Sequence, residues 1–297
     1  MVKQLRGKER DREMSFLEHL EELRWHIIRS VIAIVVLMIT AFACRDIIFD
    51  MIIIAPKTPN FITSRLLCQL GELVNSDVLC INQNPADLIN FKMAGQLTTS
   101  IVVSLVAGLI LAFPVVLWEF WKFFEPALKP NEKKYTKGAV LASSMLFFIG
   151  VLFGYFLIAP LSIHFLTTWK VSSEVTNTID IRSYIGNLTS ICLATGVIFE
   201  LPIVVFFLSK IGIVTPQFMR TYRRHAILVI VIVAAIITPP DVFSQILVSI
   251  PLLFLYEISI LISARILKQK EKESEAFMND EISTDTSIVR SSNEITH

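Results

Sequence analysis

Long stretches of apolar residues recur six times along the chain, separated by shorter polar segments. An α-helix rises 1.5 Å per residue, so about 20 apolar residues cross the roughly 30 Å hydrocarbon core of a bilayer. The pattern predicts an all-α integral membrane protein with six transmembrane helices. The predicted spans are residues 25–44, 93–118, 138–163, 183–209, 226–238 and 246–264.

The fifth apolar run is short, since about 13 residues form a helix of only about 20 Å. A buried core helix or a re-entrant segment would also fit this length. The run ends at Thr238-Pro239-Pro240-Asp241, and the two prolines force a break before the sixth run. We expect two short final helices joined by a tight outer turn, with the bilayer thinned around them.

The basic residues predict the orientation of these spans. The great majority of the 27 Lys and Arg residues lie in segments 1–30, 119–137, 209–225 and 265–297, which fall on one side of a six-span topology. Basic residues mark the cytoplasmic side, so both termini should be cytoplasmic. A basic N-terminal tail (1–13) precedes the membrane domain (14–267), and the Glu-, Ser- and Thr-rich segment 268–297 is predicted to be disordered.

Composition supports a membrane protein and excludes several classes. Hydrophobic residues make up 54% and charged residues 18%, with a mean hydropathy of +0.63, whereas soluble domains are about half apolar and a quarter charged. This argues against a soluble enzyme, a disordered chain and a disulfide-rich scaffold. The sequence has no GxxxxGK phosphate loop and no CxxC pair, so we expect neither nucleotide, cofactor nor metal. Basic inner loops and the lack of a transit peptide favour a bacterial cytoplasmic membrane.

The first outer loop, about 45–92, contains Cys68 and Cys80. In the oxidising compartment outside the cytoplasmic membrane these two residues could form a disulfide, and two unpaired thiols are the alternative. In the chain-entropy model so short a loop contributes roughly 3 kcal/mol.

A polar face precedes the first span. Ser15 and Glu18 form a capping box, which predicts a helix start, and His19, Glu22, His26 and Arg29 then recur at helical spacing. The stretch either presents carboxylates to a ligand at the membrane surface or is an ordinary solvated face with internal ion pairs.

Acidic residues further along the chain have equally simple alternatives. Glu132 could be an ordinary acidic residue in the first turn of a helix. Glu200 lies ten residues before Lys210, roughly 15 Å inside the membrane. A carboxylate there usually marks function, although it could instead bond a neighbouring helix as packing. Pro202 should kink the same helix, and Asp241, one turn before Gln245, could cap the last helix.

Several short motifs occur in a fixed order and together carry a family resemblance. They are Ser-Phe-Leu-Glu-His-Leu-Glu-Glu-Leu-Arg (15–24), Phe113-Pro114, Trp118-Glu119-Phe120-Trp121, Pro126-Ala127-Leu128, Glu132-Lys133-Lys134, Phe148-Ile149-Gly150, Phe153-Gly154-Tyr155-Phe156, Gly196-Val197-Ile198-Phe199-Glu200-Leu201-Pro202, and Thr238 to Gln245 with Pro251 and Leu255-Tyr256-Glu257. With the predicted span count, the chain resembles the TatC family over about residues 14–268. TatC proteins are the multispanning core subunits of the twin-arginine protein translocase.

The resemblance implies a non-enzymatic function in protein export. The family exports folded proteins with the energy of the proton gradient, and its six helices form a concave, glove-like shape. By motif position, Glu22 and Glu132 match the acidic residues that dock the twin-arginine motif of the signal peptide on the cytoplasmic face, and Arg24 should orient that site. Chemistry agrees, because two guanidinium groups are well matched by paired carboxylates in a partly desolvated site.

The resemblance also implies protein partners within the membrane. Glu200 matches an intramembrane glutamate on the concave side, and Asp241 and Gln245 match an outer-loop motif beside the short helices where TatA- and TatB-type single-span subunits dock. Other copies of the chain and the lipid bilayer complete the expected partners, and no nucleic acid is expected. The segment around 64–84 departs from the family pattern by its length. The alternatives from other classes are a proton-coupled small-solute carrier that uses Glu200 and an assembly factor without a transport role.

Overall fold

Helices dominate the protein. The computed structural model describes residues 16–74, 79–83, 85, 87–124, 136–172, 174, 177–238 and 242–294. The elements in chain order are α1 (Phe16–Ala43), α2 (Arg45–Ile47), the π-helix η2 (Ile48–Ile53), the 3-10 helix η3 (Ala55–Lys57), α3 (Ile62–Val74), β1 (Leu88–Ile89), α4 (Gly95–Phe124), α6 (Thr136–Phe153), the π-helix η6 (Gly154–Ile158), α7 (Ala159–Thr168), β2 (Ile179–Asp180), α8 (Ile181–Phe199), α9 (Leu201–Ile211), α10 (Pro216–Thr221), α11 (Arg223–Ile237) and α12 (Val242–Glu294).

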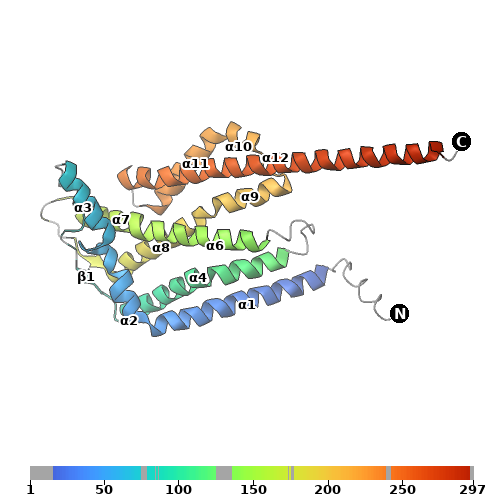
Figure 1. The fold of residues 1–297 in the computed structure, drawn as a ribbon. Coiled ribbons are helices and arrows are strands. Elements are labelled where there is room, and N and C mark those ends of the chain that lie inside the picture. The colour runs from blue at the N-terminus through green and yellow to red at the C-terminus, as the bar shows by residue number, and fades with distance from the viewer. Residues whose placement is uncertain are drawn as a thin grey trace. The chain divides into compact units, whose positions relative to one another are not determined.

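Among the residues that the structure describes, five helical stretches are long and apolar enough to cross a membrane (Figure 1). They are Leu20–Ala43, Gly95–Phe123, Gly138–Thr168, Ile181–Ile211 and Val248–Lys272. Their exposed surfaces carry large apolar side chains such as Ile39 and Leu109, as expected for helices surrounded by lipid. The remaining predicted span, 226–238, falls in α11, whose 15 residues rise only about 22 Å. Six spans, a concave shape and cytoplasmic termini stay predictions.

The last helix extends much further than the sequence suggests. α12 comprises 53 residues and ends at Glu294, so it continues through most of the segment 268–297, whose predicted disorder stays a prediction. The segment after Lys268 is rich in Lys and Glu, which are good helix formers. It also follows a helix that is already formed, so each added residue avoids the cost of nucleation.

The third span is helical throughout but changes pitch near its middle. α6 passes into the π-helix η6 and then into α7, which has Pro160 in its first turn. Proline has no N–H, so it cannot donate to the carbonyl of Phe156 one turn earlier. The hydroxyl of Thr63 on α3 donates to this carbonyl instead. The carbonyl left without a donor by Pro160 is therefore satisfied by a side chain from the segment that precedes β1.

The fourth span breaks at Glu200, as Pro202 predicts. α8 ends at Phe199 and α9 begins at Leu201, with Pro202 in the first turn of α9. α9 ends at Gly212, whose φ of 93° is the left-handed conformation that closes many helices. The N–H groups of Gly212 and Ile213 donate to the carbonyl of Leu208.

Contacts tie the first outer loop to the ends of the following helices. The buried core of this region includes Ile53, Val103 and Leu188. Tyr155 and Tyr184 donate their hydroxyls to the carbonyls of Ile52 (2.8 Å) and Ile53 (2.7 Å) at the end of η2. β1 and β2 pair in parallel, with Leu88 opposite Ile179 and Ile89 opposite Asp180.

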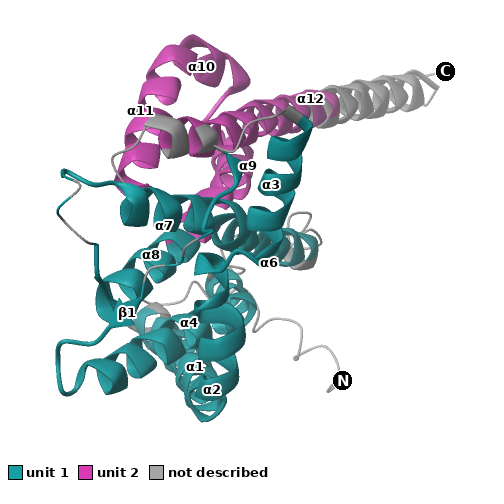
Figure 2. Cartoon of the chain, turned by 90° about the vertical axis from the view of Figure 1, so that its left-hand side faces the viewer, with its two compact units in different colours: residues 1–193 teal, residues 194–297 magenta. Residues whose placement is uncertain are grey.

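The chain divides into two compact units, residues 1–193 and 194–297, and the division falls within α8 (Figure 2). The first unit contains the paired helices α1 and α4 and the outer loop. In the second, α12 packs against α9, α10 and α11. A buried hydrogen bond of 2.8 Å between Ser209 Oγ and Ser263 Oγ links α9 to α12.

Candidate functional site

Helices α1 and α4 pack antiparallel to each other. A charged cluster lies at the end of this helix pair where α1 begins. Near the middle of the pair, a Cβ added at Gly108 would lie 2.7 Å from the backbone nitrogen of Met38, so the two helices approach closely. Further along, His26 of α1 meets Glu119 of α4. The same alignment sets the start of α1 beside the C-terminal end of α4.

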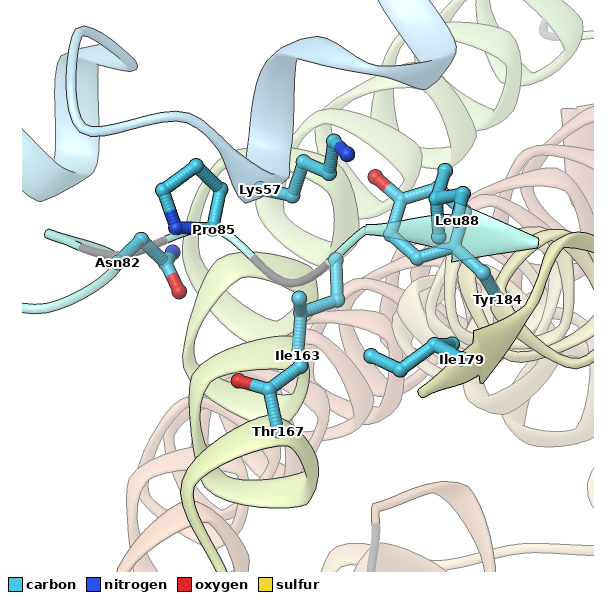
Figure 3. A pocket seen from close by; sticks show the side chains of 8 residues that line it. All are labelled: Lys57, Asn82, Pro85, Leu88, Ile163, Thr167, Ile179 and Tyr184. Atoms are coloured by element: carbon cyan, nitrogen blue, oxygen red, sulfur yellow. The ribbon is translucent and has the colours of Figure 1, made fainter. Parts of the chain in front are cut away.

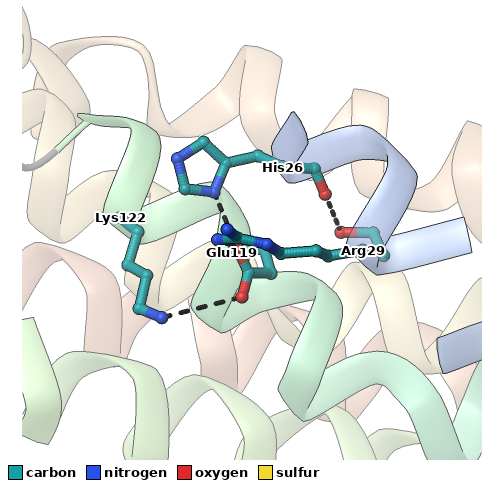
Figure 4. A network of polar contacts seen from close by, with 5 residues as sticks. His26, Arg29, Glu119 and Lys122 are labelled. Carbon is teal, nitrogen blue, oxygen red and sulfur yellow. Dashed lines mark hydrogen bonds and ion pairs between the residues drawn. The ribbon is translucent and has the colours of Figure 1, made fainter. Parts of the chain in front are cut away.

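Glu119 is the centre of this cluster (Figure 4). Glu119 is only 7% exposed, and His26 is 9% exposed. His26 Nδ1 lies 2.6 Å from Glu119 Oε2 and donates to it, and Arg29 Nη1 lies 3.6 Å from the same oxygen. Lys122 Nζ lies 3.7 Å from the other oxygen, Oε1. One buried carboxylate thus holds three basic groups, which compensates the cost of burying its charge.

Glu22 faces a pocket beside this cluster, lined by Glu22, Trp25, His26 and Arg29. Its Oε2 atom is buried, and no described residue donates a hydrogen bond to it. A buried acceptor without a donor typically costs about 1–3 kcal/mol, and more when it is charged. A cationic or hydrogen-bond-donating group in contact with this oxygen would remove that cost.

Of the other two residues predicted for the same site, the structure describes only Arg24. Arg24 is exposed and does not line the pocket. Glu132 lies outside the described residues. In the chain it follows α4, whose C-terminal end lies beside the start of α1.

Glu200 lies at the junction of α8 and α9 and is partly buried. Its backbone carbonyl accepts hydrogen bonds from the N–H groups of Ile203 and Val204, both at 3.0 Å. The carboxylate therefore projects from a helix break, where Pro202 interrupts the regular hydrogen-bond ladder.

The second unit uses its polar residues to join helices. Gln245 Nε2 donates a hydrogen bond of 3.2 Å to the carbonyl oxygen of Val231, and this bond connects α12 to α11. Arg223 and Glu257 form an ion pair between the same two helices. Asp241, the other residue of the predicted outer-loop motif, lies outside the described residues.

Cys68 and Cys80 are joined by a disulfide in the outer loop. Next to it, Asn82 adopts a left-handed backbone conformation with φ of 58° and is 5% exposed. Its amide donates to the carbonyls of Pro56 (3.2 Å) and Pro160 (3.3 Å). The adjoining cavity, of about 10 Å³, has room for about one water molecule. Figure 3 shows its lining, which includes Asn82, Leu88 and Tyr184.

Within the ranges that the structure describes, no cluster of three or more His, Cys, Asp or Glu side chains could hold a metal ion. The apolar helices and the charged cluster at the end of one helix pair define a multi-pass helical membrane protein. Its polar chemistry is of the kind that binds charged groups.

Comparison with known proteins identifies the family. Residues 18–251 match the family "Sec-independent protein translocase protein (TatC)". The chain is 39% identical to the TatC of Blattabacterium sp. subsp. Periplaneta americana over 265 residues, 89% of this chain and 100% of the relative. It is 36% identical to the TatC of Campylobacter jejuni over 258 residues, 86% of this chain and 97% of the relative.

A solved structure agrees with these relatives. A crystal structure of the "Twin Arginine Translocase Receptor- TatC" matches with a TM-score of 0.64 and 33% identity, covering 84% of this chain and 100% of that chain. The chain therefore belongs to the TatC family. It is a component of the Sec-independent protein translocase, a non-enzymatic transport subunit in a membrane. Family membership does not favour the solute-carrier alternative.

The sequence alone predicts no role for Glu119. It appeared only as one letter of the motif around Trp118, because its partners His26 and Arg29 lie 93 and 90 positions away in the chain. A signal was present in the sequence: a histidine and a glutamate stand near the same predicted membrane face, one at the start of the first span and one at the end of the second.

Proposed function

We propose that this chain is the receptor subunit that binds the twin-arginine signal peptides of folded cargo proteins on the cytoplasmic face. The bound motif docks on Glu22 and Glu132, with Arg24 orienting the site. The proposal agrees with the description of the similar solved protein as a translocase receptor. It also agrees with the concentration of Lys and Arg in the predicted cytoplasmic segments.

The observation that carries the proposal is the buried Oε2 of Glu22, which accepts no hydrogen bond from the described residues. A guanidinium group supplies up to five N–H donors in a planar fork and matches a carboxylate in two parallel hydrogen bonds. Lysine carries the same charge but donates from a single point, so it satisfies such an oxygen less specifically. A preference for arginine over lysine follows from this difference.

The pocket also offers an apolar wall. Trp25 lines it beside Glu22, and the face of an indole ring attracts a guanidinium group. A second carboxylate would complete a site for two adjacent arginines. Glu132 is the candidate, because it follows the helix whose C-terminal end lies beside the start of α1.

The same proposal covers partner organisation. TatA- and TatB-type single-span subunits dock on the short helix α11 and the adjoining first part of α12, near Asp241 and Gln245. Glu200, at the break between α8 and α9, offers a polar contact to a partner helix. Copies of the chain assemble with these subunits in the bacterial cytoplasmic membrane, with both termini cytoplasmic, and export is driven by the proton gradient.

The test is a titration of the purified full chain in lipid with a fluorescent peptide that carries the twin-arginine motif, and with its twin-lysine version. We expect tighter binding of the arginine peptide and loss of that preference in Glu22→Gln and in Glu132→Gln. Glu21→Gln is the matched control, since Glu21 is exposed on the same helix and does not line the pocket. Equal binding of both peptides, or an equal effect of Glu21→Gln and Glu22→Gln, would refute the proposal.

A further inference from the structure

The pocket of Glu22 contains basic groups of its own. His26 follows Glu22 by four residues, which is the spacing of neighbours on one helix face. Arg29 follows His26 by almost one further turn and lines the same pocket. Both side chains come from the same helix as Glu22 and could supply the hydrogen bond that its buried Oε2 lacks. In the structure neither does so.

Both basic groups are instead engaged by Glu119 of the neighbouring helix. The contacts of 2.6 Å to His26 and 3.6 Å to Arg29 converge on a single oxygen, Oε2 (Figure 4). Glu119 is nearly excluded from solvent, and charge interactions are stronger there than in water. The Arg29 side chain is 58% exposed, so its position depends mainly on this electrostatic contact and not on close packing.

We propose that Glu119 is a positioning residue of the signal-peptide site. It keeps Arg29 away from Glu22, so that the carboxylate of Glu22 remains available to an arginine of the ligand. Without the charge of Glu119, Arg29 pairs with Glu22 and occupies the place of the incoming guanidinium group. Because Arg29 is tethered to the same helix, its effective concentration at Glu22 is high, and it competes strongly with a free peptide. This inference rests on the proposed function.

The substitution Glu119→Gln tests whether the negative charge of Glu119 keeps Arg29 away from Glu22. A glutamine has the size of the glutamate, and its carbonyl oxygen can still accept the hydrogen bond from His26. The glutamine lacks the negative charge that attracts Arg29, so the substitution releases Arg29 from position 119. We expect the affinity for the twin-arginine peptide to fall about tenfold, which corresponds to about 1.4 kcal/mol.

Two double variants separate competition by Arg29 from a general change in charge. Lys122 also contacts Glu119, at 3.7 Å through Oε1, but it does not line the Glu22 pocket. The variants Glu119→Gln/Arg29→Gln and Glu119→Gln/Lys122→Gln therefore have the same net charge as the native chain and differ only in which basic group is removed. We expect the first to restore the native affinity to within about twofold and the second to leave it reduced.

The binding experiment uses the full chain in lipid with the same fluorescent peptide at fixed salt. The inference is supported if Glu119→Gln/Arg29→Gln restores the native affinity and Glu119→Gln/Lys122→Gln does not. Unchanged affinity in Glu119→Gln, equal restoration by both double variants, or restoration by neither would overturn it. A native chain that fails to prefer arginine over lysine refutes the proposed function, and the control of Arg29 by Glu119 is then decided by the coupling measurement that needs no peptide.

A second measurement needs no peptide. A double-mutant cycle between Glu22→Gln and Arg29→Gln is followed by thermal unfolding, once in the native background and once in the Glu119→Gln background. We expect no coupling between the two residues when Glu119 is present, and a clear coupling when it is replaced. The same coupling in both backgrounds, or none in either, would show that Glu119 does not control the position of Arg29.

Discussion

The close approach of α1 and α4 at Gly108 gives the sharpest test of the structure. A Cβ at this position would lie 2.7 Å from the nitrogen and 2.9 Å from the Cα of Met38, both backbone atoms that cannot rotate away. Carbon atoms pack best at about 3.5–4.0 Å, so the substitution Gly108→Ala must push the helices apart by roughly 1 Å. Overpacking of this kind costs about 1–3 kcal/mol.

The control is a glycine with open space around it. A Cβ at Gly186 of α8 would meet nothing within 4 Å. Alanine is a better helix former than glycine by about 1 kcal/mol, and both variants share this gain. The difference in stability between Gly108→Ala and Gly186→Ala therefore reports the clash, and we expect the former to be less stable by about 1–3 kcal/mol.

The assay is reversible unfolding of the purified chain in mixed detergent, followed by tryptophan fluorescence. The same displacement should weaken the contact between His26 and Glu119, so we also expect Gly108→Ala to bind the twin-arginine peptide less tightly than Gly186→Ala does. Equal stability of the two variants would refute the close helix approach. Equal peptide binding would show that the cluster does not depend on it.

Two further predictions concern the outer loop. Replacing Cys68 and Cys80 by serine should lower the free energy of unfolding by about 3 kcal/mol, because closing the loop restricts the unfolded chain; reducing agent should then destabilise the native chain and leave the double variant unchanged. Asn82→Ala should destabilise by about 1–3 kcal/mol, since it leaves the carbonyls of Pro56 and Pro160 without their amide donor. Asn82→Gly removes the same amide, but glycine adopts the left-handed backbone conformation without strain. Thermal unfolding should therefore show a smaller loss of stability in Asn82→Gly than in Asn82→Ala. An equal loss of stability in the two variants would contradict this account.

Elements that depend on neighbours in the chain were predicted well. Within a bilayer a backbone must satisfy its hydrogen bonds locally, so a long apolar run has to form a helix, and five such runs are present as helices. The break near Glu200 follows from Pro202 in the same way. After Lys268, where composition predicts disorder, α12 continues to Glu294, as propagation from a helix that is already formed allows.

Of the residues predicted for the signal-peptide site, the structure describes Glu22 and Arg24. Glu22 was identified from a motif, and its buried oxygen agrees with a binding role. Glu119 was overlooked because a motif gives no information about which residue faces another across a helix pair. Arg24 was expected to support the site, yet it is exposed and outside the pocket.

The sequence by itself determined that the chain crosses a membrane, where its long apolar helices lie, and that one of them breaks near Pro202. All of these depend on hydrogen bonds within four residues and on the length of apolar runs. Only the tertiary structure decided that His26 and Glu119 meet and that Asn82 joins two distant prolines. Such contacts depend on how the surfaces of two helices pack together, as at Gly108 and Met38. This packing depends on the side chains of both helices, so neither segment alone predicts it.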